Sequence, residues 1–84
     1  MPKPVIKRHN GFKTSQMKRG VLYIEGKNMN FRIIKSMGKR YLVLENEAIS
    51  FRNFDELFSK LRERQVRFMI AYDKYNKSYA TIVL

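Results

Sequence analysis

The pattern of hydrophobic and polar positions predicts a group of short strands in the first half of the chain. Three runs are rich in β-branched and aromatic side chains, at residues 20–26, 31–36 and 41–46. Polar stretches that contain Gly or Asn, KNMN and MGKR, separate these runs, and such stretches are typical of turns. The pattern therefore predicts an antiparallel meander of three strands.

A helix over about residues 53–65 is the strongest local prediction. Asn53 followed by Glu56 matches a capping box, in which side chains accept hydrogen bonds from otherwise unpaired amides. Apolar residues then recur with the spacing of one helical face, and they are Phe54, Leu57, Phe58 and Leu61. This stripe is suited to pack on a sheet.

Two further strands are expected after the helix. The polar stretch DKYNK is flanked by VRFMIAY, residues 66–72, and SYATIVL, residues 78–84, which together predict a hairpin. The predicted fold class is therefore α+β. It is an antiparallel β-meander packed on one helix and followed by a C-terminal β-hairpin, in the order β-β-β-α-β-β.

Apolar and polar residues do not alternate regularly within the predicted strands, which leaves two interpretations open. Leu22 and Ile24 predict one buried face, but Val21 and Tyr23 on the opposite face are apolar too. Either both faces of the sheet are partly covered, or one face presents an apolar and aromatic surface to a partner.

The N-terminal residues 1–19 differ from the rest of the chain. They include six Lys or Arg residues and no acidic residue, and their apolar residues show no period. Pro2, Pro4 and Gly11 interrupt the segment. We expect a basic flexible arm over residues 1–19 and a single α+β domain over residues 20–84.

The net charge adds a functional expectation. The chain has 18 Lys and Arg residues against 7 Asp and Glu residues, a formal net charge of +11 at pH 7. Self-repulsion between charges on this scale weakens the compact state, and such a charge excess is often retained because it binds a negative partner. The partner classes are nucleic acid, an anionic membrane surface and an acidic protein. No run is apolar enough to span a bilayer, and the N-terminus lacks a secretory apolar region. We expect a cytoplasmic protein with no membrane partner.

The sequence contains few residues of the types that carry catalysis. The chain has no cysteine, which excludes disulfides and cysteine-based metal sites, and its single histidine, His9, lies in the expected arm. Glu45 and Glu47 are interpreted as solvated acids, and the glycine motifs that bind phosphate are absent. We expect a binding protein, not an enzyme, with no cofactor and no metal.

The candidate binding residues are mostly cations of the arm and of the predicted sheet. Lys39 and Arg40 fall in the MGKR turn, where flexible cations can meet phosphate oxygens. Arg32 projects from a strand, where a guanidinium can pair with guanine in a major groove. The candidate nucleic-acid-binding set is Lys7, Arg8, Lys13, Lys18, Arg19, Arg32, Lys35, Lys39, Arg40 and Tyr41.

Four short stretches within residues 18–65 carry a resemblance to a known family. They are Lys18-Arg19-Gly20-Val21, Phe31-Arg32 with Ile34, Gly38-Lys39-Arg40, and Phe54-Asp55-Glu56 at the start of the helix. Together they resemble the AP2 DNA-binding domain and the related arm-binding domains of phage and transposon integrases. The resemblance implies a three-stranded antiparallel sheet packed on one helix, with the sheet face in the major groove. It also implies DNA contacts at Arg19, Arg32, Lys35, Lys39 and Arg40.

Two functions are consistent with these features. The first is nucleic-acid binding, to DNA more than to RNA, through the basic arm and a sheet face, in a regulatory or recombination-accessory role of a mobile element. The alternative is a small phage-type inhibitor or adaptor that binds a host nucleic-acid-processing protein. The surplus of apolar residues at open sheet positions favours that alternative. The oligomeric state is left open.

Overall fold

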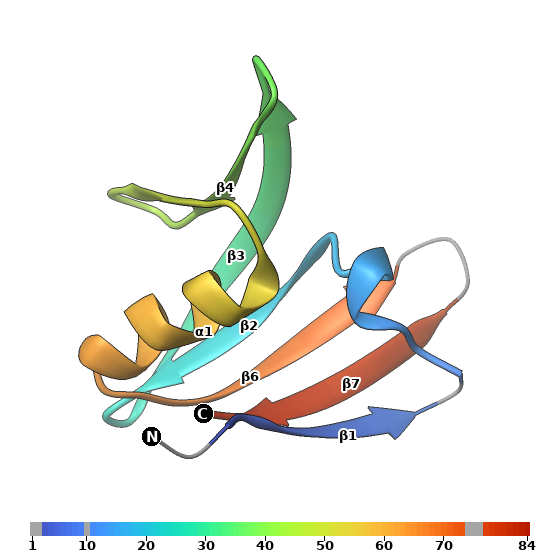
Figure 1. The fold of residues 1–84 in the computed structure, drawn as a ribbon. Coiled ribbons are helices and arrows are strands. Elements are labelled where there is room, and N and C mark those ends of the chain that lie inside the picture. Colours follow the sequence, from blue (N-terminus) through green and yellow to red (C-terminus); the bar gives the residue numbers. More distant parts are fainter. Residues whose placement is uncertain (1–2, 10, 74–76) are drawn as a thin grey trace.

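The computed structural model describes residues 3–9, 11–73 and 77–84. The described residues form one antiparallel sheet with the strand order β1-β7-β6-β2-β3-β4-β5 (Figure 1). The strands are β1 (Val5–His9), β2 (Arg19–Ile24), β3 (Lys27–Ser36), β4 (Lys39–Val43), β5 (Ala48–Phe51), β6 (Val66–Asp73) and β7 (Ser78–Val83). The helix α1 spans Phe54–Glu63, and a short 3-10 turn, η1, spans Thr14–Gln16.

The predicted antiparallel sheet with one helix is confirmed, but the predicted order β-β-β-α-β-β is wrong because it omits β1 and β5. The omitted β5 is only four residues long and lies between the end of β4 and the helix. Such a short run has little periodicity of its own, and its pairing with β4 identifies it as a strand. Residues 18–65, for which the AP2 resemblance implies three strands, contain β2, β3, β4, β5 and α1.

The N-terminal segment belongs to the folded domain in this structure, where we expected a flexible arm. Strand β1 pairs antiparallel with β7, from Val5 opposite Val83 to His9 opposite Tyr79. Phe12 and Met17, on either side of η1, are 1% and 2% exposed. Lys7 and Arg8 of the segment are therefore carried by an edge strand, and Lys13 and Lys18 flank a turn that packs on the sheet.

Both turns of the β2–β3–β4 region differ in position from the prediction. The first turn is Glu25-Gly26, and the KNMN stretch is the beginning of β3. The second is Met37-Gly38, so that Lys39 and Arg40 begin β4 and do not lie in the turn. Both pairs have positive φ values, the geometry of two-residue turns that match the twist of a hairpin.

Met37 is an unusual residue for such a turn. It is 100% exposed and has a φ of 51°, a conformation that asparagine tolerates better than methionine. Met37→Asn is expected to raise the free energy of unfolding by about 0.5–1 kcal/mol, measured by urea denaturation. Ser36→Asn, at an ordinary strand position, is the control and should give no gain. A less stable Met37→Asn protein would contradict this turn geometry.

The helix begins as the sequence predicts. The Asn53 side chain accepts a hydrogen bond from the Glu56 amide at 2.9 Å. The Glu56 carboxylate accepts from the backbone amide and the Nε of Arg52, and these bonds hold the pKa of Glu56 below its ordinary value. At the other end of the helix, Lys60 donates to the carbonyl of Ser50 at 2.7 Å, which joins α1 to β5.

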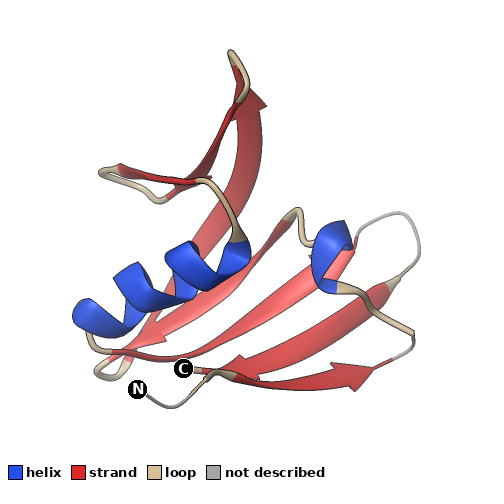
Figure 2. Ribbon diagram, viewed as in Figure 1, coloured by secondary structure: helices blue, strands red, loops and turns tan. Residues whose placement is uncertain are grey.

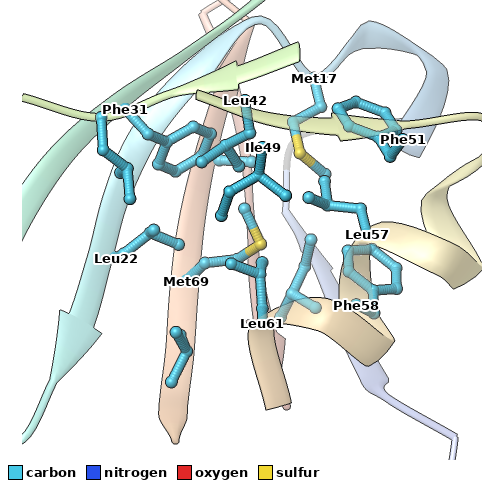
Figure 3. Packing of buried hydrophobic residues seen from close by; sticks show 14 of the residues in the cluster. Met17, Leu22, Phe31, Leu42, Ile49, Phe51, Leu57, Phe58, Leu61 and Met69 are labelled. Carbon is cyan, nitrogen blue, oxygen red and sulfur yellow. The ribbon is translucent and has the colours of Figure 1, made fainter. Parts of the chain in front are cut away.

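The hydrophobic core lies between one face of the sheet and the helix. Strand β3 is long: its first half pairs with β2 and its second half with β4, so the sheet bends around the helix (Figure 1). Figure 3 shows Leu57 and Leu61 of α1 facing Leu22 and Met69 of the central strands. All four residues are fully buried. The predicted apolar stripe of the helix thus packs on the sheet.

Candidate functional site

The opposite face of the sheet is open. Both α1 and η1 lie on the core side, and within the described residues no helix covers the other side (Figure 2). Burial alternates along the strands: Gly20 and Leu22 are buried, whereas Arg19, Val21 and Tyr23 are not. Because cross-strand partners share a face, the strand register identifies the outward positions among the paired residues. We call this surface the open face.

A row of five cross-strand neighbours runs across the open face. The pairs are His9 with Tyr79, Tyr79 with Tyr72, Tyr72 with Arg19, and Arg19 with Arg32. These residues come from β1, β7, β6, β2 and β3. We call them the open row. It has an aromatic half and a cationic half that meet where Tyr72 lies opposite Arg19.

The aromatic half of the open row exposes its rings. Tyr72 is 38% exposed and Tyr79 is 39% exposed. His9 stacks on Tyr79 with ring centroids 4.5 Å apart and planes 13° from parallel. A shallow hollow of about 230 Å³ is lined by Arg19 and by both tyrosines. Asp73, which is 5% exposed, also lines this hollow, together with Lys77 and Ser78.

The cationic half places two like charges opposite each other. Arg19 and Arg32 are cross-strand partners, and neither forms an ion pair with another described residue. Like charges directly opposite on a sheet destabilise it by about 0.2–1 kcal/mol. The other charged residues at outward strand positions, Lys7 and Lys39, are also cationic, and no acid occupies an outward position of the described strands. The charged side chains at outward strand positions are therefore all cationic.

The predicted binding residues divide between the two sides of the sheet. The open face holds Lys7, Arg19, Arg32, Lys39 and Tyr41. The remaining cations lie elsewhere: Arg8 and the cross-strand pair Lys35 and Arg40 are at core-side positions, and Lys13 and Lys18 flank η1.

Three of the other cations lie around the Phe54 ring at the start of the helix. The Arg40 guanidinium lies over the Phe54 ring, 5.7 Å from its centroid. Lys18, Lys35 and Arg40 line a small hollow of about 140 Å³ together with Phe54. The predicted set therefore does not form one continuous surface, because strand alternation sends neighbouring cations of β3 and β4 to opposite sides.

Sequence reasoning missed the aromatic half of the open row. The sequence pattern places His9 in the expected arm, and it places Tyr72 and Tyr79 in strands without indicating a binding role. One signal was present: both tyrosines flank the DKYNK stretch of the predicted hairpin, where a short loop makes them neighbours. The partnership of His9 with Tyr79 had no local signal.

The acidic side chains of the described residues form no candidate metal site. Among them, no group of three or more His, Asp or Glu side chains is arranged to hold a metal ion. Glu47 pairs with Arg64 of the helix end and raises the pKa of that guanidinium. Within the described ranges, no helix has the length and apolar character needed to cross a membrane.

Comparisons of the chain with protein-family models, with curated proteins and with solved structures found no match. The geometry of the open row is therefore the basis for a proposed function.

Proposed function

We propose that this protein binds nucleic acid, with DNA as the first class to test, through the open row and the neighbouring cations of the open face. The observation that carries the proposal is the pairing of Arg19 with Arg32 on a face that has no acidic residue at its outward strand positions. Phosphate groups between these guanidinium groups would turn a repulsive pair into two charge-assisted contacts.

The distribution of the remaining charges supports the same proposal. Acids of the chain neutralise cations beside the helix, where Glu56 pairs with Arg52 and Lys60, and Glu47 pairs with Arg64. The open face receives no such compensation, so part of the net charge of +11 is concentrated there. A polyanion is the partner that gains most from such a surface, through release of its counterions.

The resemblance to AP2 domains supports the proposal through Arg19, Arg32 and Lys39. These three residues lie on the open face, whereas Lys35 and Arg40 lie on the core side. A regulatory or recombination-accessory role is part of the proposal, as the sequence led us to expect.

Removal of one arginine from the open face tests the proposal. Arg19→Gln and Arg32→Gln are each expected to weaken DNA binding about tenfold at low salt and to lower the slope of log affinity against log salt by about 1. Fluorescence anisotropy at several salt concentrations measures both quantities.

Arg67→Gln is the matched control. It removes the same charge from β6 at the register shift between β2 and β6, outside the open row, so the affinity should fall little. Absence of DNA and RNA binding by the wild-type protein at low salt would contradict the proposal. Equal losses of DNA affinity in all three variants would show that binding depends on the net charge of the protein and not on the open row.

A second function, binding of a host protein as an inhibitor or adaptor, rests on a different part of the open face. Val5 and Val83 are cross-strand partners that are 57% and 41% exposed. Beside them Tyr23 stacks on Phe68, with centroids 4.8 Å apart. Apolar and aromatic anchors of this kind are typical of protein interfaces. Recovery of one stoichiometric partner that resists nuclease and moderate salt would favour this function.

A further inference from the structure

We infer that the nucleic acid is single-stranded, with bases stacked on Tyr72 and on the Tyr79–His9 pair and with phosphates held by Arg19 and Arg32. This inference rests on the proposed function and adds the class of ligand and the roles within the open row.

The width of the open row argues against a duplex groove. The row crosses five adjacent strands, and strands lie about 4.8 Å apart, so it extends over about 19 Å. The major groove of DNA is about 12 Å wide and admits a two-stranded ribbon. A surface five strands wide is too broad to enter that groove, whereas an extended single strand can lie across it.

The exposed rings point to bases whose faces are free. In a duplex the base faces are covered by their neighbours, but an unpaired base offers a face that can stack on an aromatic side chain. Tyr72 is 38% exposed, and it stacks with no other ring of the described residues. Its ring is therefore available to a base.

His9 prepares the second stacking position. Its ring covers one side of Tyr79 at 4.5 Å and so restrains the tyrosine before a ligand arrives. A restrained side chain loses less conformational entropy on binding. The edge strand β1 thus contributes a positioning residue to the site, in addition to the charge of Lys7.

The junction of the aromatic and cationic halves can accept a base and the phosphate attached to its sugar at neighbouring positions. Arg19 lies opposite Tyr72, and the hollow of about 230 Å³ is lined by Arg19, Tyr72 and Tyr79. A base stacked on Tyr72 leaves its sugar and phosphate beside the Arg19 guanidinium. Arg32, the next residue in the row, is placed to meet the following phosphate.

Three probes of equal phosphate number separate stacking from electrostatics. They are an oligothymidylate of about twelve nucleotides, within the range that small single-strand-binding folds occupy, an abasic strand of the same length, and a short hairpin duplex. The chain has five tyrosines and no tryptophan. Quenching of tyrosine emission therefore reports stacking directly, beside the affinity measured by anisotropy.

The expected result is that oligothymidylate binds at least tenfold more tightly than the abasic strand and the duplex. Tyr72→Leu and Tyr79→Leu should each weaken oligothymidylate binding about 5- to 100-fold and should leave abasic binding unchanged. Tyr72→Phe and Tyr79→Phe keep the ring and should bind as the wild type does. Tyr23→Leu, at an outward position outside the open row, is the matched control for lost aromatic area.

The outcomes separate this inference from the function on which it rests. Equal binding of the abasic strand and oligothymidylate, or wild-type affinity in both leucine variants, overturns stacking while salt-dependent nucleic-acid binding stands. Tighter binding of the duplex, without quenching, does the same. No binding of any probe at low salt overturns both. Circular dichroism and thermal unfolding establish that each variant is folded.

Discussion

Replacing Phe12 by alanine is expected to lower the free energy of unfolding by about 3–5 kcal/mol. Phe12 precedes η1 in the segment that its charge pattern assigned to a flexible arm, yet it is 1% exposed and belongs to the same buried cluster as the residues of the sheet and helix. Truncation removes a large buried ring and leaves a cavity that the surrounding side chains fill only in part.

A loss of this size is large for a chain of 84 residues. Domains are stable by about 5–15 kcal/mol in total, so the variant would approach the limit of a folded population. Urea denaturation followed by circular dichroism gives the midpoint and the slope. A fall in midpoint with an unchanged slope identifies a loss of stability without a change in the surface exposed on unfolding.

Lys13→Ala is the matched control for Phe12→Ala. Its side chain is exposed, so its truncation is expected to change the free energy of unfolding by no more than about 0.5 kcal/mol. If Phe12→Ala behaved as Lys13→Ala does, the N-terminal segment would not be packed on the sheet. His9 would then also be lost from the open row.

Gly20→Ala is expected to destabilise the protein by about 3 kcal/mol, at the upper end of what overpacking costs in a core. An alanine Cβ at this position would lie 1.9 Å from the carbonyl oxygen of Ile70 and 2.8 Å from the Phe31 ring. The nearer atom is backbone, which cannot turn aside as a side chain can. Strands β2 and β6 would have to separate at the centre of the sheet.

The same separation would disturb the candidate site. Arg19 precedes Gly20 and lies opposite Tyr72, so the register between β2 and β6 sets the junction of the open row. Gly20→Ala should therefore also weaken DNA binding in the proposed function, although the substitution alters no charge and no ring. Thermal unfolding and anisotropy measured on one preparation give both effects.

Gly38→Ala provides the comparison for Gly20→Ala. Gly38 has a φ of 77° but no heavy atom within 4 Å of a Cβ, so its substitution adds backbone strain without a clash. That strain costs roughly 1–2 kcal/mol. A Gly20→Ala protein as stable as the wild type would contradict the close approach of β6 to β2.

The helix was predictable because its determinants are local. Asn53 and Glu56 are three residues apart, and the apolar stripe repeats within three turns. The hairpin β6–β7 was predictable for a similar reason, since its two runs are close in sequence. Each of these elements carries within about a dozen residues the information that specifies it.

The two missed strands depend on partners outside their own segments. β1 is a five-residue basic run that pairs with β7 at the other end of the chain, and β5 becomes a strand by pairing with β4. The misplaced first turn has another cause: KNMN is polar but forms the beginning of β3, because all four of its residues pair with β2. The polar composition of KNMN predicted a turn, but the pairing of this stretch with β2 makes it part of a strand.

The sequence by itself determined the helix, the excess of positive charge and the surplus of apolar residues on strands with two apolar faces. Only the tertiary structure decided which side of the sheet the helix covers, and hence which cations and rings share the open face. His9, Arg32 and Tyr79 are far apart in the chain and meet through antiparallel pairing between distant strands. Because side chains alternate strictly along a strand, a shift of one residue in register would send them to the core side. That register is fixed by the burial of residues such as Leu22 and Met69 on the opposite face.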